Sequence, residues 1–160
     1  MQVLIMYYSA SGNTEKLADR IAQGVREVAD VACIVKPAAE VTRDDFLSSD
    51  AIIAGSPVYF GTMAAGLKAV FDKFVGLRAK MSDKVGAAFA TSGDASGGKE
   101  TTLMSIIQAM LIYGMIIIGD PMDATGHYGT SCVGSPDEAA DGNAQKLGRR
   151  VAALVKKLKS

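Results

Sequence analysis

The densest group of residues that could bind a ligand lies near the N-terminus, at Ser9-Ala10-Ser11-Gly12-Asn13-Thr14. An apolar run at residues 3–8 precedes it, and an apolar stripe of helical spacing follows at residues 17–28. A strand, a polar turn and a helix start form an anion site, because the free N–H groups and the dipole of the helix favour negative charge there. The turn contains no Lys or Arg. We therefore expect neutral dipoles to hold a phosphate group. The alternative is an ordinary N-cap, but a cap needs only one polar side chain, whereas this turn has Ser9, Ser11, Asn13 and Thr14.

The elements that must position this turn follow from the hydrophobic pattern. Apolar runs of strand type recur at residues 31–35, 51–55, 85–90 and 115–118. Stripes of helical period lie between and after them, at residues 67–74, 103–111 and 139–158. Strands alternating with helices predict one α/β domain over residues 1–160, with a doubly wound five-stranded parallel sheet and helices on both faces. Of the common strand orders we favour 2-1-3-4-5, which brings the loops after the first, third and fourth strands to one crevice.

The loops after the third and fourth strands have compositions that suit a flat ring. The first of these loops offers two adjacent aromatic side chains, Tyr59 and Phe60, and we expect one of them to fold back into the core. The second is rich in glycine, and its backbone amides can bond the polar edge of a heterocycle. We expect Ser96 to cap the helix that follows. The ligand-binding residues predicted in the two loops are Pro57, Val58, Tyr59, Phe60, Gly61, Thr91, Ser92, Gly93, Asp94, Gly97 and Gly98.

Other phosphate-binding motifs are missing from the sequence. It contains no GxxxxGK[ST] motif, and no GxGxxG follows the first strand. Both the P-loop NTPases and the usual dinucleotide-binding fingerprint are therefore excluded. A site for one terminal phosphate and one flat ring fits FMN.

Composition excludes several further classes. Lys and Arg together number 17, as do Asp and Glu, so no basic stripe marks a nucleic-acid partner. The longest later apolar stretch, residues 110–118, is too short to span a bilayer, and we expect neither a signal peptide nor membrane insertion. Two distant cysteines, Cys33 and Cys132, indicate free thiols in the cytoplasm. A single histidine, His127, excludes a multi-histidine metal site, and no metal is expected.

Longer motifs carry a resemblance to a known family. The segment Tyr7-Tyr8-Ser9-Ala10-Ser11-Gly12-Asn13-Thr14 resembles the flavodoxin phosphate-loop signature [ST]-x-[ST]-G-x-T. The segments Gly55-Ser56-Pro57-Val58-Tyr59-Phe60-Gly61-Thr62-Met63 and Gly97-Gly98-Lys99-Glu100-Thr101-Thr102 resemble two flavin loops of the WrbA-type NAD(P)H:quinone oxidoreductases. Tyr113-Gly114-Met115 stands where that family has H-G-M, and His127-Tyr128-Gly129 is similar to its P-Y-G.

The resemblance implies a flavodoxin-like fold and hydride transfer from NAD(P)H through FMN to a quinone. It implies that Tyr113 borders the flavin, and it makes Tyr113 and His127 the candidates for orienting nicotinamide or quinone. The alternative for Tyr113 is a core role at the end of a helix, and the alternative for His127 is a surface or structural imidazole. A homodimer or homotetramer is also implied. The chain departs from the family in having no tryptophan and in a shorter segment at residues 37–46. The alternative is a flavodoxin-type electron carrier whose acceptor is a redox protein, although zero net charge is unlike carriers that steer partners by charge.

Overall fold

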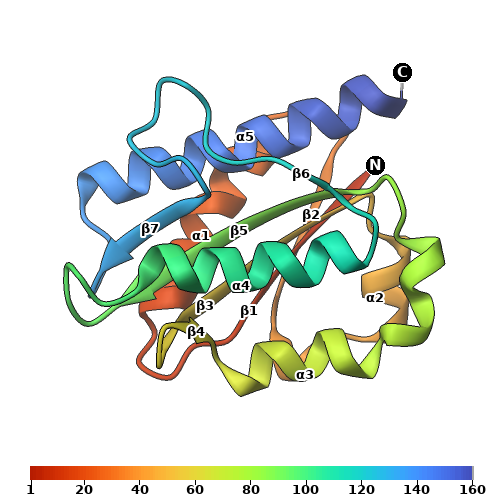
Figure 1. Ribbon diagram of the computed structural model, residues 1–160. Coiled ribbons are helices and arrows are strands. Elements are labelled where there is room, and N and C mark those ends of the chain that lie inside the picture. The colour runs from red at the N-terminus through yellow and green to blue at the C-terminus, as the bar shows by residue number, and fades with distance from the viewer. Residues whose placement is uncertain (160) are drawn as a thin grey trace.

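The apolar runs of the sequence form the central sheet of the protein, which we describe from a computed structural model covering residues 1–159 (Figure 1). Its strands β1 (Gln2–Tyr7), β2 (Ala32–Pro37), β3 (Ala51–Tyr59), β5 (Val85–Ser92) and β6 (Ile116–Ile117) are parallel and lie in the order β2-β1-β3-β5-β6. The predicted order 2-1-3-4-5 is confirmed, because β4 (Thr62–Met63) only extends the end of β3 as an antiparallel hairpin.

The fifth position of the sheet is divided between two short strands. β6 pairs with the beginning of β5, and β7 (Thr130–Val133) pairs with its end, where Phe89 lies beside Thr130. Residues 118–129 leave the sheet between them, and His127 belongs to this segment. The sequence predicted the first half of the fifth strand and missed the second, because Thr130-Ser131-Cys132-Val133 is too polar to stand out as an apolar run.

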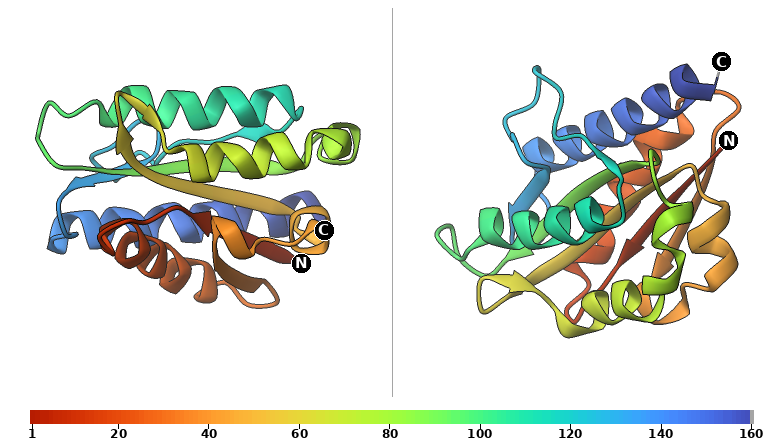
Figure 2. Two further views of the ribbon diagram at one scale, coloured as in Figure 1. Left: turned by 90° about the horizontal axis from the view of Figure 1, so that it is seen from below. Right: turned by 45° about the vertical axis from the view of Figure 1, so that its right-hand side comes forward.

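Helices cover both faces of the sheet, as Figure 2 shows. α1 (Asn13–Arg26) and α5 (Glu138–Lys159) lie on one face, and α3 (Ala65–Lys73) and α4 (Lys99–Ile112) on the other. The short helix α2 (Arg43–Ser48) adds Phe46 to the core beneath α3 and α4. Two 3-10 turns, η1 (Ala38–Glu40) and η2 (Val75–Lys80), complete the chain.

The core consists of two layers, one on each side of the sheet. Leu4 and Ile52 point into the layer under α3 and α4, whereas their neighbours Ile5 and Ile53 point toward α1 and α5. All these side chains are fully buried. Strands covered on both faces must be apolar at every position, which is why the sequence shows continuous runs and no alternation. No helix in residues 1–159 has the length and apolar character that crossing a membrane requires.

Candidate functional site

The carboxyl ends of β1, β3 and β5 bring three loops to one edge of the sheet. Register places Tyr7 of β1 beside Gly55 of β3, and Pro57 of β3 beside Thr91 of β5. The loops that follow are residues 8–12 (the first loop), 57–61 (the second loop) and 93–98 (the third loop). Parallel strands place all their following loops on one side, so the predicted crevice is a direct consequence of the strand order.

The first loop ends at a helix start that no side chain caps. Gly12 is the N-cap of α1 and has φ of 84°, a left-handed conformation that glycine adopts without strain. Its N–H donates to Ser9 Oγ at 3.1 Å, which closes the turn. Ser11 is exposed, and Asn13 is half-buried. The first-turn N–H groups of α1 receive no side-chain oxygen and are available to an anion.

Two threonines join the first loop to the third. Thr14 is buried, and its Oγ1 lies 2.9 Å from Oγ1 of Thr91 at the end of β5. Sequence reasoning assigned the Thr14 side chain to a phosphate. In the structure this hydroxyl fixes the spacing of two loops and so positions the helix start, and its predicted contact with a phosphate stays a prediction.

The second loop is a tight hairpin that displays its aromatic residues to solvent. Phe60 and Gly61 form its tip with φ of 51° and 76°, and this pair of positive values is typical of a type I′ turn. Phe60 is fully exposed, and Tyr59 is 40% exposed and contacts Tyr8 edge-on, with ring centroids 6.1 Å apart. The expectation that one of the two aromatic rings folds into the core is wrong. A bulky residue at positive φ is uncommon and costs free energy, and such positions cluster at functional sites.

Buried hydrogen bonds hold the base of this hairpin. Ser56 Oγ accepts the Ala64 N–H at 2.8 Å and donates to the Pro57 carbonyl at 2.7 Å. Ser105 of α4 accepts the Met63 N–H at 3.0 Å. These contacts fix both ends of the second loop, so its exposed rings stand on a rigid base.

The third loop touches the second through two glycines. A Cβ on Gly98 would come within 3.2 Å of Gly61 Cα, so the two backbones approach as closely as glycine permits. Gly98, with φ of 90°, is the N-cap of α4, and the prediction that Ser96 caps this helix is wrong. Ser92 Oγ donates to the Asp94 carbonyl at 2.7 Å, and that carbonyl also accepts the Gly97 N–H. Gly93, Asp94 and Ala95 remain exposed at the tip.

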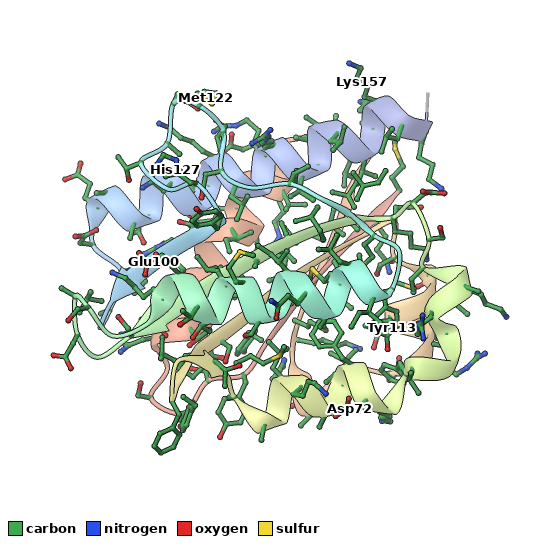
Figure 3. All side chains as sticks on the ribbon, viewed as in Figure 1. Asp72, Glu100, Tyr113, Met122, His127 and Lys157 are labelled. Carbon is green, nitrogen blue, oxygen red and sulfur yellow. The ribbon has the colours of Figure 1, made fainter. Side chains whose placement is uncertain are left out.

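Tyr113 lies outside this crevice. It is the C-cap of α4, and Figure 3 shows it at the opposite end of the helix from Glu100. Its side chain is buried against Phe46 and Phe71, and its hydroxyl donates to the Phe71 carbonyl at 2.5 Å. Burial raises the pKa of Tyr113 to about 12, so the hydroxyl remains a neutral donor. In its own chain Tyr113 is therefore a core residue at the end of α4, and its expected roles toward the flavin and toward nicotinamide or quinone stay predictions.

His127 is exposed and lies on the 118–129 segment, outside the three loops. Its ring meets Tyr128 edge-on, with centroids 6.5 Å apart, at the mouth of a polar pocket beside the start of α4. Its predicted role toward nicotinamide or quinone stays a prediction. Sequence reasoning missed Asp120 in the same segment. This carboxyl is buried, its Oδ2 accepts the Gly129 N–H at 3.0 Å, and burial raises its pKa.

Tyr7 is a second buried phenol, at the end of β1. Its hydroxyl donates to Glu15 Oε1 at 2.8 Å, and its burial, together with this bond, raises its pKa to about 12. The bond ties the strand before the first loop to the helix after it. Tyr7 therefore supports the geometry of the turn and remains protonated at neutral pH.

Several known proteins are similar to this chain in sequence or in fold. The family model described as NADPH-dependent FMN reductase matches residues 27–129. A protein of Archaeoglobus fulgidus named NAD(P)H dehydrogenase (quinone) is 34% identical, over 98% of this chain and 98% of its own length. A protein of Aquifex aeolicus named flavodoxin is 33% identical, over 96% of this chain and 86% of its own. A WrbA-like flavodoxin structure from Agrobacterium tumefaciens superposes with a TM-score of 0.84, covering 98% of each chain at 21% identity, which shows the shared flavodoxin-like fold. On the sequence matches, this chain belongs to the NADPH-dependent FMN reductase family of flavodoxin-like proteins.

Proposed function

We propose that the protein binds one FMN in the crevice between its three loops and transfers a hydride from NAD(P)H to a quinone. The observation that supports this most is the uncapped start of α1, held beside two exposed aromatic rings by contacts between the loops. The match to a reductase family and the relative named NAD(P)H dehydrogenase (quinone) support the same chemistry.

The residues of the crevice suit both ends of FMN. At the first loop, Ser9, Ala10, Ser11, Gly12, Asn13 and Thr14 provide amides and hydroxyls but no cation, which fits a phosphate bound by dipoles. The other two loops meet at the contact between Gly61 and Gly98. The residues that we expect to border the flavin there are Pro57, Val58, Tyr59, Phe60, Gly61, Thr91, Ser92, Gly93, Asp94, Gly97 and Gly98. Bound FMN would supply the hydride acceptor and donor, and the protein would position the ring and tune it through amide hydrogen bonds.

A flavodoxin-type electron carrier is the second function to test, and the 33% identity to the Aquifex aeolicus flavodoxin supports it. A carrier would pass electrons to a redox protein and would not oxidise NAD(P)H rapidly. The zero formal charge of the chain favours the enzyme, because carriers commonly use a charged surface to steer association. We place the protein in the cytoplasm, since both cysteines are free thiols.

Steady-state turnover separates the two functions. FMN-loaded protein is mixed with NADH or NADPH and a water-soluble benzoquinone, and oxidation of the nicotinamide is followed by absorbance. The proposal expects catalytic oxidation that saturates with both substrates. No oxidation above the rate of free FMN would contradict the enzyme and favour the carrier.

Replacing Tyr59 with alanine should raise KM for quinone or nicotinamide about two- to tenfold, the equivalent of the roughly 0.5–1.5 kcal/mol that an aromatic contact contributes. FMN should stay bound, because its phosphate lies at the first loop. The melting temperature should change little, because Tyr59 is already 40% exposed. Met122→Ala, at an exposed apolar residue far from the crevice, is the matched control. Unchanged steady-state kinetics together with a large drop in melting temperature would show that Tyr59 is a packing residue.

We also propose that the chain forms a homodimer or homotetramer. A groove of about 740 Å³ runs between α3 and α4, from Tyr59 and Phe60 to Val75 and Ile112. These four residues are all among the exposed large hydrophobic side chains. A second copy over this groove would cover them, and it would also border the crevice at the second loop.

Sedimentation tests this assembly. Wild-type protein at micromolar concentration should sediment as a dimer or tetramer. Ile112→Lys, which puts a charge in the groove, should shift it toward the monomer, whereas Leu158→Lys, at an exposed residue near the end of α5, should not. A monomeric wild-type protein with full turnover would overturn the proposal.

A further inference from the structure

An acidic residue stands in the first turn of α1, directly after the first loop. Glu15 is the third residue of this helix, whose N-cap is Gly12. A glutamate at the third position commonly turns back and accepts a hydrogen bond from an N–H group at the helix start. No side chain caps α1 in this way. In that conformation Glu15 would compete with an anion for the N–H groups of the helix start.

The start of α2 shows an acidic side chain in that conformation. Asp45, the third residue of α2, accepts the N–H of the N-cap Thr42 at 2.9 Å, and Thr42 Oγ1 accepts the Asp45 N–H at 3.1 Å. Together the two side chains form a capping box. Thus α2 occupies its start with its own side chains, whereas α1, with an acidic residue at the same position, does not.

Tyr7 makes the contact that engages Glu15 instead. Its hydroxyl donates to Glu15 Oε1 at 2.8 Å. The Tyr7 ring is buried in the core layer under α1 and α5, which fixes the position of the hydroxyl. Glu15 itself is exposed and belongs to none of the ion pairs among residues 1–159. The hydrogen bond from Tyr7 therefore decides where the Glu15 carboxylate lies.

The donor of this hydrogen bond keeps its proton at neutral pH. Burial is the largest cause that raises the pKa of Tyr7 to about 12, followed by the hydrogen bond and the negative charge of Glu15. The charges of Asp19 and Glu40 act in the same direction. The charged side chains that act on this hydroxyl are all carboxylates, so it stays a neutral donor to Glu15 throughout the physiological range.

We propose that Tyr7 is a positioning residue for the FMN phosphate, because its hydroxyl holds the Glu15 carboxylate away from the N–H groups at the start of α1. The inference rests on the proposed function, in which the first loop and this helix start bind the phosphate. Without the Tyr7 hydroxyl, Glu15 turns back toward the helix start. Its carboxylate then accepts from the N–H groups that the phosphate needs and places negative charge beside it.

Tyr7→Phe tests the proposal, because it keeps the buried ring and removes only the hydroxyl. Calorimetry of the protein freed of flavin compares the affinities for FMN and riboflavin. Tyr7→Phe should weaken the binding of FMN about two- to fivefold, the range for one charge at a helix end, and leave the affinity for riboflavin unchanged. The loss should shrink as ionic strength rises, because salt screens the charge of an exposed side chain.

Removal of Glu15 separates the positioning role from a role in the shape of the turn. Glu15→Ala should bind FMN at least as tightly as wild type does, and adding Tyr7→Phe to it should cause no further loss. Asp19→Ala, at an exposed carboxylate one turn further along α1, is the matched control. In that background Tyr7→Phe should weaken FMN binding as much as it does in wild type.

The outcomes distinguish this inference from the proposed function. Wild-type protein that binds FMN no more tightly than riboflavin would overturn the phosphate site, and with it the role of Tyr7. If wild type does prefer FMN, an unchanged FMN affinity in Tyr7→Phe would overturn the positioning role alone. An equal loss with and without Glu15 would overturn it as well, because Tyr7 would then act only through the shape of the turn.

Discussion

Replacing Tyr113 with alanine is expected to lower the free energy of unfolding by about 3–5 kcal/mol, the range for truncating a buried aromatic side chain. The ring is 4% exposed and packs against Phe46 and Phe71 in the layer under α3 and α4. Its removal leaves a cavity and deprives the Phe71 carbonyl of a hydrogen bond. Chemical denaturation followed by circular dichroism measures the loss.

The matched variant Tyr113→Phe keeps the ring and removes only the hydroxyl. It should cost about 1 kcal/mol, the usual net contribution of one hydrogen bond. In both variants the folded protein should bind FMN as wild type does, because Tyr113 lies at the far end of α4 from the third loop. An alanine variant of full stability that has lost nicotinamide or quinone affinity would show that Tyr113 belongs to the substrate site.

FMN should bind at one per chain and at least about a hundredfold more tightly than riboflavin. Each hydrogen bond to a charged phosphate contributes roughly 1.5–3 kcal/mol, and the start of α1 offers several donors. FAD should bind weakly, because the first loop and the start of α1 suit a terminal phosphate. Calorimetry of the protein freed of flavin gives all three affinities, and equal affinity for FMN and FAD would contradict the assignment.

The exposed Ser11 provides the sharper variant of this experiment. Ser11→Ala should weaken the binding of FMN about tenfold and leave the affinity for riboflavin unchanged, since only FMN carries the phosphate. Ser82→Ala, at an exposed serine just before β5 and so at the opposite end of that strand from the loops, serves as the control. If Ser11→Ala weakens both ligands alike, the first loop does not hold the phosphate.

Much of the fold could be predicted from local hydrophobic patterns in the sequence. Strands buried on both faces appear in the sequence as apolar runs, and the alternation with helical stripes leads to the strand order and to three loops at one edge. The polar strand β7 and the 118–129 segment left no such pattern. Pairing with β5 stabilises β7, and bonds to α5 hold the segment, so both depend on contacts distant in sequence.

Differences between the expected and observed positions of single residues have similarly specific causes. Family resemblance placed Tyr113 beside the flavin, yet α4 has 14 residues and is therefore about 21 Å long, which separates its end from the third loop. The N-cap of α4 is Gly98 and not Ser96, because this position has a left-handed backbone with φ of 90° and a Cβ there would come within 3.2 Å of Gly61 Cα. Both aromatic residues of the second loop are exposed because a tight turn points its tip away from the core.

Anaerobic mixing of FMN-loaded protein with NADH or NADPH tests the central claim most directly. A rapid-mixing spectrophotometer follows the oxidised flavin band, and a quinone is then added to the reduced protein. We predict that the band bleaches rapidly, at a rate that saturates with nicotinamide concentration, and that it returns when the quinone is added. A band that stays oxidised with both nucleotides would contradict the enzyme and leave the electron carrier as the function of the crevice.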